Sequence, residues 1–448
     1  MLTSFPNITV MASINNELAL FQPIPTEKAI DEVKWVNYRP TMQITDSGPI
    51  EFNISPTSSY YVLLSKTYLG LKVKITKKDG TSITNQNVAL TNLPLSSCFR
   101  QCDISLNQQI INASVSTNYP YKAYLDVLLN SNSDQKEGVL QGEGFYKDVA
   151  YYFDRGDNAG HSYRQRLTKN SIIADFQGVL HCDIAKQDRA ILNNVGINVK
   201  LWQSNDEFRL FSGPEVDESV STDYKLEIVD AVLKVCFLSV NPSTIIAQNA
   251  MLASKPASYP FWKSVVKSYG IAKGSFSFTI EDLFFGNCPN QLVVGFVKSS
   301  AYSGDMKSNP FNFEHFSLNF LEFTLDSVSV PGTPFSPKYI EDPTSGSGGT
   351  PKKQYLNGYT NEYLSLFKSK FPKRDGISVA LSDYPGGYCL YVFDLKPGTN
   401  KHLYSEPVNG HTRLSGKFDS ALEDPLVAIV YGIFPSNFSI DQSRLVSQ

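Results

Sequence analysis

The residues of this chain best suited to metal binding are five histidines, at positions His161, His181, His315, His402 and His411. Metal-binding histidines usually recur at short fixed spacings, as in HExxH on one face of a helix. None of the five stands in such a spacing. We therefore expect surface histidines or hydrogen-bonded polar ones, and we predict no metal-binding residues.

Cys98 and Cys102 are the closest pair among the six cysteines. A structural zinc site needs a second close pair of ligands, which the sequence lacks. If this segment is a strand, both side chains point to the same face. We expect buried free thiols here, and all six cysteines reduced, because the cytosol and nucleus keep thiols reduced.

Motifs of nucleotide-binding and hydrolytic enzymes are also missing from the sequence. The Ser-Gly run at 345–349 lacks the Gly-Lys-Ser/Thr ending of a phosphate-binding loop. There is neither a G-x-S-x-G nucleophile elbow nor a GxGxxG dinucleotide fingerprint. A pair of glycosidase carboxylates stays open, because sequence does not report their separation in space. We predict no catalytic and no cofactor-binding residues, and a binding or structural role rather than an enzyme.

The composition of the 448 residues favours large β-sheet cores. Hydrophobic residues make up 42% and charged residues 19%, with 28 Phe and 24 Tyr, and flat rings pack well on a pleated sheet. The net charge of -3 argues against a basic surface that condenses a genome. No apolar run is long enough to span a bilayer, and the first residues lack the pattern of a signal peptide. We expect synthesis in the cytosol or nucleus.

The elements around the chemistry-bearing residues follow one order twice. A strand-like alternation at 104–107 precedes an apolar segment at 118–129, and a similar alternation at 323–326 precedes 357–367. In the first copy, Pro120 can begin a helix because its missing N–H costs nothing there. Core packing of that helix is favoured over ligand binding.

Each half then closes with a pair of strand-like segments. They lie at 178–184 and 195–201 in the first half and at 412–418 and 425–431 in the second. Two copies of strand, short helix, long loop and strand pair predict two tandem all-β domains of one topology.

The expected domain organisation is an N-terminal arm at 1–34, a first domain at 35–216 and a second domain at 217–448. The second boundary follows from an acidic connector at 212–219 between two apolar strand runs. A Gly-, Ser- and Pro-rich stretch at 343–351 is expected to be a flexible insertion.

Several runs of residues, taken in order, resemble the hexon-like capsid proteins of Polinton/Maverick elements and adintoviruses. The resemblance covers about residue 15 to the end, and one of the runs that carry it is the strand and helix at 106–129. The other runs that carry it are 144–148, 204–208, 309–320, 357–359 and 440–444. Any single run is weakly specific, whereas the ordered set is fairly specific.

This resemblance implies a double jelly-roll major capsid protein: an all-β chain of two tandem eight-stranded sandwiches with short helices in the long loops. Three chains would form a pseudo-hexameric homotrimer, and trimers would tile an icosahedral shell around double-stranded DNA. The implied partners are the chain itself, neighbouring capsomers, and penton and minor capsid proteins, with no sequence-specific nucleic acid. The implied location is the virion, after synthesis in the host cytoplasm and with assembly in the nucleus left open.

Other functions stay open at this point. The chain is shorter than many of its capsid relatives, so a minor capsid role is possible. A carbohydrate-binding or adhesive double β-sandwich would share the long loops and the tyrosine content. A β-sandwich hydrolase would need clustered acidic residues or a triad in one cleft.

Overall fold

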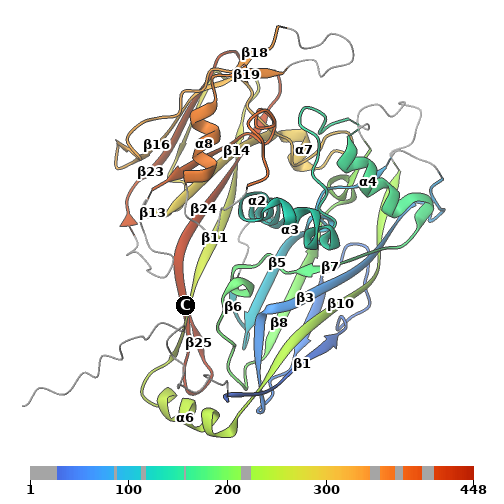
Figure 1. Cartoon of the computed structure of the whole chain (residues 1–448), viewed down its shortest axis with the longest axis vertical. Helices are drawn as coiled ribbons and strands as arrows, with labels where there is room; N and C mark the ends of the chain where they lie inside the picture. Colours follow the sequence, from blue (N-terminus) through green and yellow to red (C-terminus); the bar gives the residue numbers. More distant parts are fainter. Residues whose placement is uncertain are drawn as a thin grey trace, which may run out of the picture.

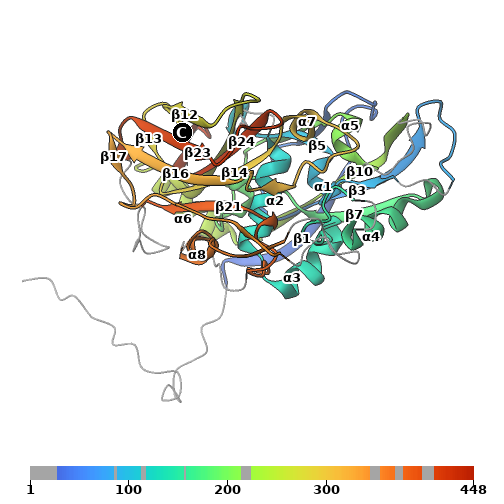
Figure 2. The same cartoon turned by 90° about the horizontal axis from the view of Figure 1, so that it is seen from above.

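The computed structural model describes residues 28–84, 88–112, 118–155, 158–212, 223–343, 354–368, 377–395 and 408–448. Two β-sandwiches stand side by side, and the N-terminal half forms one while the C-terminal half forms the other (Figures 1 and 2). Among the described residues, no helix is long and apolar enough to cross a membrane.

The first sandwich contains two antiparallel four-stranded sheets. One has the order β1-β10-β3-β7 and the other the order β2-β8-β5-β6. In β8, alternate residues are buried because successive side chains point to opposite faces of the sheet. The strands are β1 (Ile30–Tyr38), β2 (Ile50–Ile54), β3 (Tyr60–Lys77), β5 (Phe99–Leu106), β6 (Gln109–Asn112), β7 (Ala174–Val179), β8 (Ile197–Gln203) and β10 (Tyr224–Val240).

The second sandwich repeats this design, with sheets ordered β11-β24-β14-β21 and β12-β23-β16-β17. Its strands are β11 (Ala257–Ile271), β12 (Ser277–Glu281), β14 (Gln291–Lys298), β16 (Leu318–Leu325), β17 (Val328–Ser329), β21 (Leu390–Asp394), β23 (Thr412–Phe418) and β24 (Leu426–Ile440). The short strand β25 (Val446–Ser447) pairs with β24.

Both sandwiches have jelly-roll topology. When the eight strands of either one are numbered in chain order, its two sheets read 1-8-3-6 and 2-7-4-5. The expected all-β fold of two tandem eight-stranded jelly rolls is confirmed.

The repeat around 104–107 and 323–326 is also confirmed in detail. Each segment ends strand 4 and enters a two-residue hairpin turn to strand 5. The turn residues are Asn107 and Gln108 in the first domain and Asp326 and Ser327 in the second, and all four have positive φ. Such turns match the twist of paired strands.

The expected strand pairs are not equivalent to one another. The segment 178–184 covers only the end of β7, and β7 and β8 are strands 6 and 7 of their domain. The segments 412–418 and 425–431 instead lie on β23 and β24, which are strands 7 and 8. Alternation alone does not distinguish successive strands of one sandwich. The sequence comparison therefore set strands 7 and 8 of the second domain against strands 6 and 7 of the first.

The expected boundaries at 34/35 and 216/217 are also displaced. Residues 30–34 belong to β1 rather than to an arm, and residues 1–27 lie outside the described part. β10, which falls after the expected second boundary, pairs with β1 and β3 of the first sandwich. It therefore completes the first jelly roll, and the connection to the second domain runs through the helix α6 (Pro242–Leu252).

Short helices lie in the connections between strands, as expected. They are α1 (Pro94–Ser97), α2 (Tyr119–Asn130), α3 (Ser133–Glu137), η2 (Val139–Glu143), α4 (Ala159–Thr168), η3 (Lys169–Ser171), η4 (Asp183–Lys186), α5 (Asp206–Arg209), α7 (Ser299–Ser303) and α8 (Thr360–Lys368). The described residues also form two-stranded ribbons: β4 (Ala89–Leu90) with β9 (Leu210–Phe211), β13 (Asn287–Cys288) with β22 (Val408–Asn409), β15 (Phe313–Glu314) with β20 (Gly386–Gly387), and β18 (Ile340–Glu341) with β19 (Tyr355–Asn357). The expected insertion tip at 344–351 is outside the described residues.

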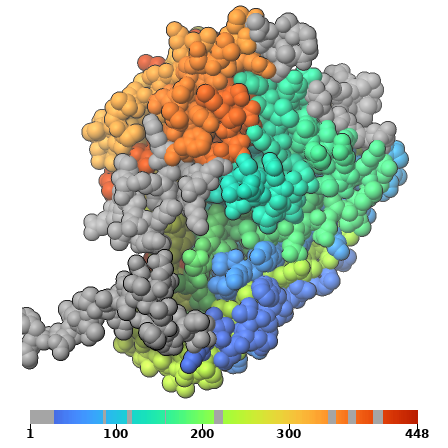
Figure 3. Space-filling model, viewed as in Figure 1, coloured from blue at the N-terminus to red at the C-terminus, as the bar shows by residue number. Residues whose placement is uncertain are grey.

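Each sandwich has its own apolar core, and α2 joins them. The first core cluster contains the inward residues of both sheets of the first domain. The second cluster contains those of the second domain together with buried residues of α2, although α2 belongs to the first domain. Figure 3 shows the teal surface of the first domain against the orange surface of the second domain.

Candidate functional site

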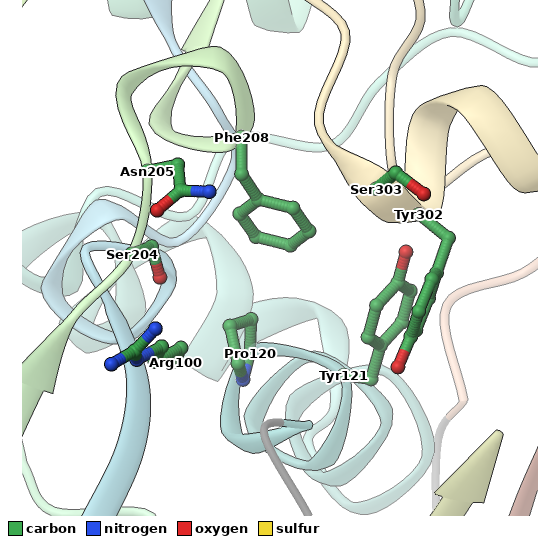
Figure 4. A pocket seen from close by; sticks show the side chains of 8 residues that line it. All are labelled: Arg100, Pro120, Tyr121, Ser204, Asn205, Phe208, Tyr302 and Ser303. Atoms are coloured by element: carbon green, nitrogen blue, oxygen red, sulfur yellow. The ribbon is translucent and has the colours of Figure 1, made fainter.

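A pocket of about 220 Å³ opens between the two domains, near the start of α2 (Figure 4). The rings of Tyr121 and Tyr302 stack on one side, with centroids 5.7 Å apart. Among the described residues, no carboxylate, histidine or cysteine lines the pocket, so its serine and tyrosine hydroxyls have no adjacent base that would activate them as nucleophiles. The lining residues are Arg100, Pro120, Tyr121, Ser204, Asn205, Phe208, Tyr302 and Ser303.

The histidines that the structure describes have different surroundings. His161 is fully buried against the Phe211 ring, and burial, with a smaller effect of Arg164, lowers its pKa to about 4. His181 Nε2 lies 2.8 Å from Glu143 Oε2, and His315 Nδ1 accepts a hydrogen bond from a backbone N–H. Within the described ranges, no group of three or more His, Cys, Asp or Glu side chains could hold a metal ion.

The other two histidines differ in what the structure describes. His411 is exposed, with Nε2 3.5 Å from Glu281 Oε2. His402 lies outside the described residues.

All six cysteines are free and buried. Cys98 immediately precedes β5, and Cys102 lies on β5. Cys102 Sγ lies 3.0 Å from Cys182 Sγ, a neighbour that sequence spacing does not reveal because the two residues are 80 positions apart. The contact with Cys182, together with burial, raises the pKa of Cys102 well above its usual value.

We expect these thiols to react slowly in the native protein. Burial raises the pKa of Cys98 to about 12 and that of Cys389 to about 11, and the thiolate is the reactive form. Alkylation followed by intact-mass measurement should show little modification of the native chain and six modifications after denaturation. Fewer than six, with a mass deficit of two hydrogens per missing pair, would reveal disulfides.

The most elaborate polar and aromatic cluster lies at the junction of the two domains, around α2. Residues 119–129 of this helix are all buried, whereas an amphipathic surface helix buries only one face. The Tyr124 ring stacks on Phe311 of the second domain, with centroids 4.2 Å apart and an interplanar angle of 1°. The Tyr121 ring meets Phe311 and Phe313 edge-on. α2 is therefore shared core between the domains.

Charged residues of α2 form ion pairs within this buried junction. Lys122 Nζ lies 2.7 Å from Asp183 Oδ1 and donates to the His181 carbonyl. Asp126 pairs with Lys186 and accepts a hydrogen bond of 2.8 Å from the Tyr431 hydroxyl of β24. The network thus begins in the first domain and ends in the second.

The second domain also donates a backbone group to this network. The N–H of Ser264, on β11, donates to Asp183 Oδ2 at 2.8 Å. The Tyr431 hydroxyl contacts the Ser264 hydroxyl as well, at 3.1 Å. Side chains and backbone of both domains therefore share the same two carboxylates.

In the junction, neighbouring opposite charges stabilise the ionised forms of Lys122 and Asp126. Burial acts to lower the pKa of Lys122, but the Asp183 and Asp126 carboxylates outweigh it and raise that pKa above its ordinary value. Burial acts to raise the pKa of Asp126, but Lys186 and Lys122 hold it below its ordinary value. Both groups are therefore ionised at neutral pH, as buried charges must be when they are paired.

A second buried ion pair stabilises the long connection between β6 and β7, strands 5 and 6 of the first domain, which we call the F–G connection. Arg164 and Asp148 are both fully buried, with Nη2 2.8 Å from Oδ1. Arg164 also donates to the Leu90 and Tyr146 carbonyls. The Tyr388 hydroxyl of the second domain donates to the Asp148 carbonyl at 2.5 Å, so this connection too contacts both jelly rolls.

A carboxylate with a shifted pKa lies beside this connection. Burial, reinforced by Asp154, raises the pKa of Glu314 to about 7 despite the opposing effect of Lys298. Asn312 Nδ2 bridges the two carboxylates, at 2.8 Å from Asp154 and 2.6 Å from Glu314. Neither carboxylate lines the pocket described above.

Glu314→Gln should therefore change how stability depends on pH. In the unfolded chain this carboxyl loses its proton near pH 4.5, before the folded chain does, so wild-type stability falls as the pH rises from about 4.5 to about 7. The variant lacks this loss and should be more stable at pH 8 by about 3 kcal/mol, with no difference at pH 4. Thermal melts across this range should show it, with Glu137→Gln at an exposed position as the control; parallel profiles for wild type and Glu314→Gln would contradict it.

Comparison with known proteins agrees with the topology. No family model matches the sequence. The uncharacterized protein F54H12.2 of Caenorhabditis elegans is 24% identical over 438 residues, which cover 94% of this chain and 97% of that protein. The chain also superposes on a chain of the Sputnik virophage with a TM-score of 0.63 at 14% identity, covering 100% of this chain and 94% of the other.

Two further solved structures share the architecture over nearly the whole length. The mavirus major capsid protein gives a TM-score of 0.55 at 12% identity, with 99% of this chain and 96% of the other covered. VP54 of PBCV-1, fitted into a reconstruction of Sputnik, gives 0.56 at 10% identity, with 95% and 98% covered. This chain is a double jelly-roll protein. The sequence did not single out the junction around α2, although Lys122 and Asp126, one turn apart in an apolar helix, are a signal for it.

Proposed function

We propose that this chain is a major capsid protein of the Polinton/Maverick and adintovirus kind, which forms pseudo-hexameric homotrimers that tile an icosahedral shell around double-stranded DNA. The observation that carries this proposal is the pair of jelly rolls with identical strand order, joined rigidly through α2. Support comes from the likeness over nearly the whole chain to the mavirus major capsid protein.

The presence of two similar jelly-roll domains in each chain explains how a trimer could fit into an icosahedral face. A tile on an icosahedral face needs six similar neighbours, and a three-fold ring of chains with two similar domains offers six similar edges. The two domains must then keep a fixed relative orientation. The buried ion pairs and ring stacks of the junction supply that rigidity.

The Polinton/Maverick assignment rests on the sequence resemblance. A nearly full-length relative in an animal is in keeping with a mobile element. We propose the virion as the location, with synthesis in the host cytoplasm and assembly there or in the nucleus, and neighbouring capsomers, penton and minor capsid proteins as partners. The net charge of -3 gives no reason to add a nucleic acid to these partners. We propose no enzymatic activity.

Light scattering coupled to size exclusion tests the oligomer. We expect three times the chain mass of 49.8 kDa, with little monomer on dilution, because obligate interfaces commonly bury more than about 2,000 Å². A stable monomer or a two-fold dimer would contradict the capsid proposal. Specific binding of such a monomer on a glycan array would favour the adhesive alternative.

A further inference from the structure

Within one chain, the two domains meet where a helix of the first packs on a sheet of the second. The outer face of the β11-β24 part of the second domain's sheet is covered by α2, which belongs to the F–G connection of the first domain. On this face, the Tyr431 hydroxyl of β24 reaches Asp126 of α2. Coverage from both sides leaves every residue at 119–129 buried.

The equivalent helix of the second domain is α8, which lies in the same F–G connection. On one side it packs against its own domain, where Ser365 Oγ accepts a hydrogen bond from the Val392 N–H of β21. Its other side is partly exposed to solvent: the exposed fraction is 46% for Leu364 and 39% for Phe367. Unlike α2, α8 has contacts on one face only among the described residues.

Among the described residues, the equivalent sheet face of the first domain is exposed as well. On β1, Val33 is 43% exposed and Trp35 is 52% exposed, and both point to the same side of the strand. The Trp35 indole N–H donates to the Lys66 carbonyl of β3 at 3.4 Å, so its ring spans β10 on the outer face of the sheet. In the second domain, α2 contacts the corresponding sheet face through the Tyr431 hydroxyl of β24.

These two bare surfaces lie on different domains of one chain, and Figure 1 shows α8 well separated from β1. One copy therefore cannot bring them together. A second copy can, by repeating the contact that already joins the first domain to the second. When a contact joins two different patches, each copy is rotated relative to the one before it. The copies close into a ring if that rotation is a whole fraction of 360°.

We propose that α8 of one copy packs on the outer face of β1 and β10 of the next copy, with Leu364 and Phe367 against Val33 and Trp35. The proposal rests on the trimer proposed above and names its interface. Around the trimer, the three contacts between copies, made by α8, would alternate with the three contacts within copies, made by α2. All six helices of the ring then lie between two jelly rolls.

Charge substitutions test each surface separately. Trp35→Glu should disable the sheet face and Leu364→Glu the helix face, and each variant should run as a folded monomer in light scattering. A buried aromatic anchor commonly changes affinity by roughly 30-fold or more, and each ring loses all three contacts at once. Val33→Glu provides a second variant of the sheet face that keeps the tryptophan, and circular dichroism with a thermal melt verifies folding.

Two exposed apolar residues of equivalent position serve as matched controls. Ile110 on β6 is 50% exposed and Val328 on β17 is 65% exposed, and both lie on strand 5 of their sandwich, in the opposite sheet. Ile110→Glu and Val328→Glu should leave the trimer intact.

Mixing the two monomeric variants gives the most specific result. The Trp35→Glu chain keeps its helix face and the Leu364→Glu chain keeps its sheet face, so one intact contact forms between them. At high concentration the mixture should contain a dimer of one chain of each kind, which neither variant forms alone. If the Trp35→Glu or Leu364→Glu variant is a trimer, or if the mixture contains no such dimer, the proposed interface is wrong. The proposed function would still stand in that case if the wild type is a trimer. A monomeric wild type would overturn both.

Discussion

Arg164→Met is expected to lower the free energy of unfolding by roughly 3–5 kcal/mol, the usual result of removing one partner of a buried ion pair. The substitution leaves the fully buried Asp148 carboxylate without its cation. It also removes the donor to the Leu90 and Tyr146 carbonyls. Methionine has a similar volume, so a packing defect does not explain the loss.

Urea unfolding followed by circular dichroism measures this effect. The matched control is Arg166→Met on the same helix, where the side chain is exposed and its guanidinium lies over the Tyr163 ring. The control should change stability by less than about 1 kcal/mol. An equal effect of the two substitutions would contradict the role of the buried pair.

Tyr124→Ala is expected to cost roughly 3–5 kcal/mol, as for other large buried aromatic residues. Its ring is 1% exposed and stacks on Phe311 across the junction of the domains. Because the stack joins the two cores, its loss should also separate their unfolding. Differential scanning calorimetry should then show two transitions in the variant where the wild type shows one.

Tyr163→Ala is the control for this substitution. Tyr163 also stacks on a ring, that of Tyr146 at 5.5 Å, but it is 53% exposed and lies within the first domain. We expect a small loss of stability and no change in the number of transitions. If Tyr124→Ala behaves in the same way, α2 does not couple the two jelly rolls.

The sequence predicts those features of the fold that local chemistry determines. Alternation located β23 at 412–418 with the right bounds, and the repeated alternation at 104–107 and 323–326 located the ends of β5 and β16 to within one residue. The helix expected at 118–129 is α2, one residue displaced. In each case the signal lies within a few neighbouring residues.

Features that depend on distant residues were not predictable in this way. The acidic connector at 212–219 suggested a boundary before β10, but the pairing of β10 with β1 is decided by partners about 200 residues away. The contact between Cys102 and Cys182 depends on how strands and loops meet in space. The burial of α2 on all sides depends on the second domain, which its own periodicity does not report.

Electron microscopy of the expressed protein tests the central claim most directly. If the chain is a capsid tile, class averages should show three-fold particles with six similar lobes, and closed shells should appear where such particles associate. Separate two-lobed particles with no three-fold averages at any concentration would contradict the capsid account.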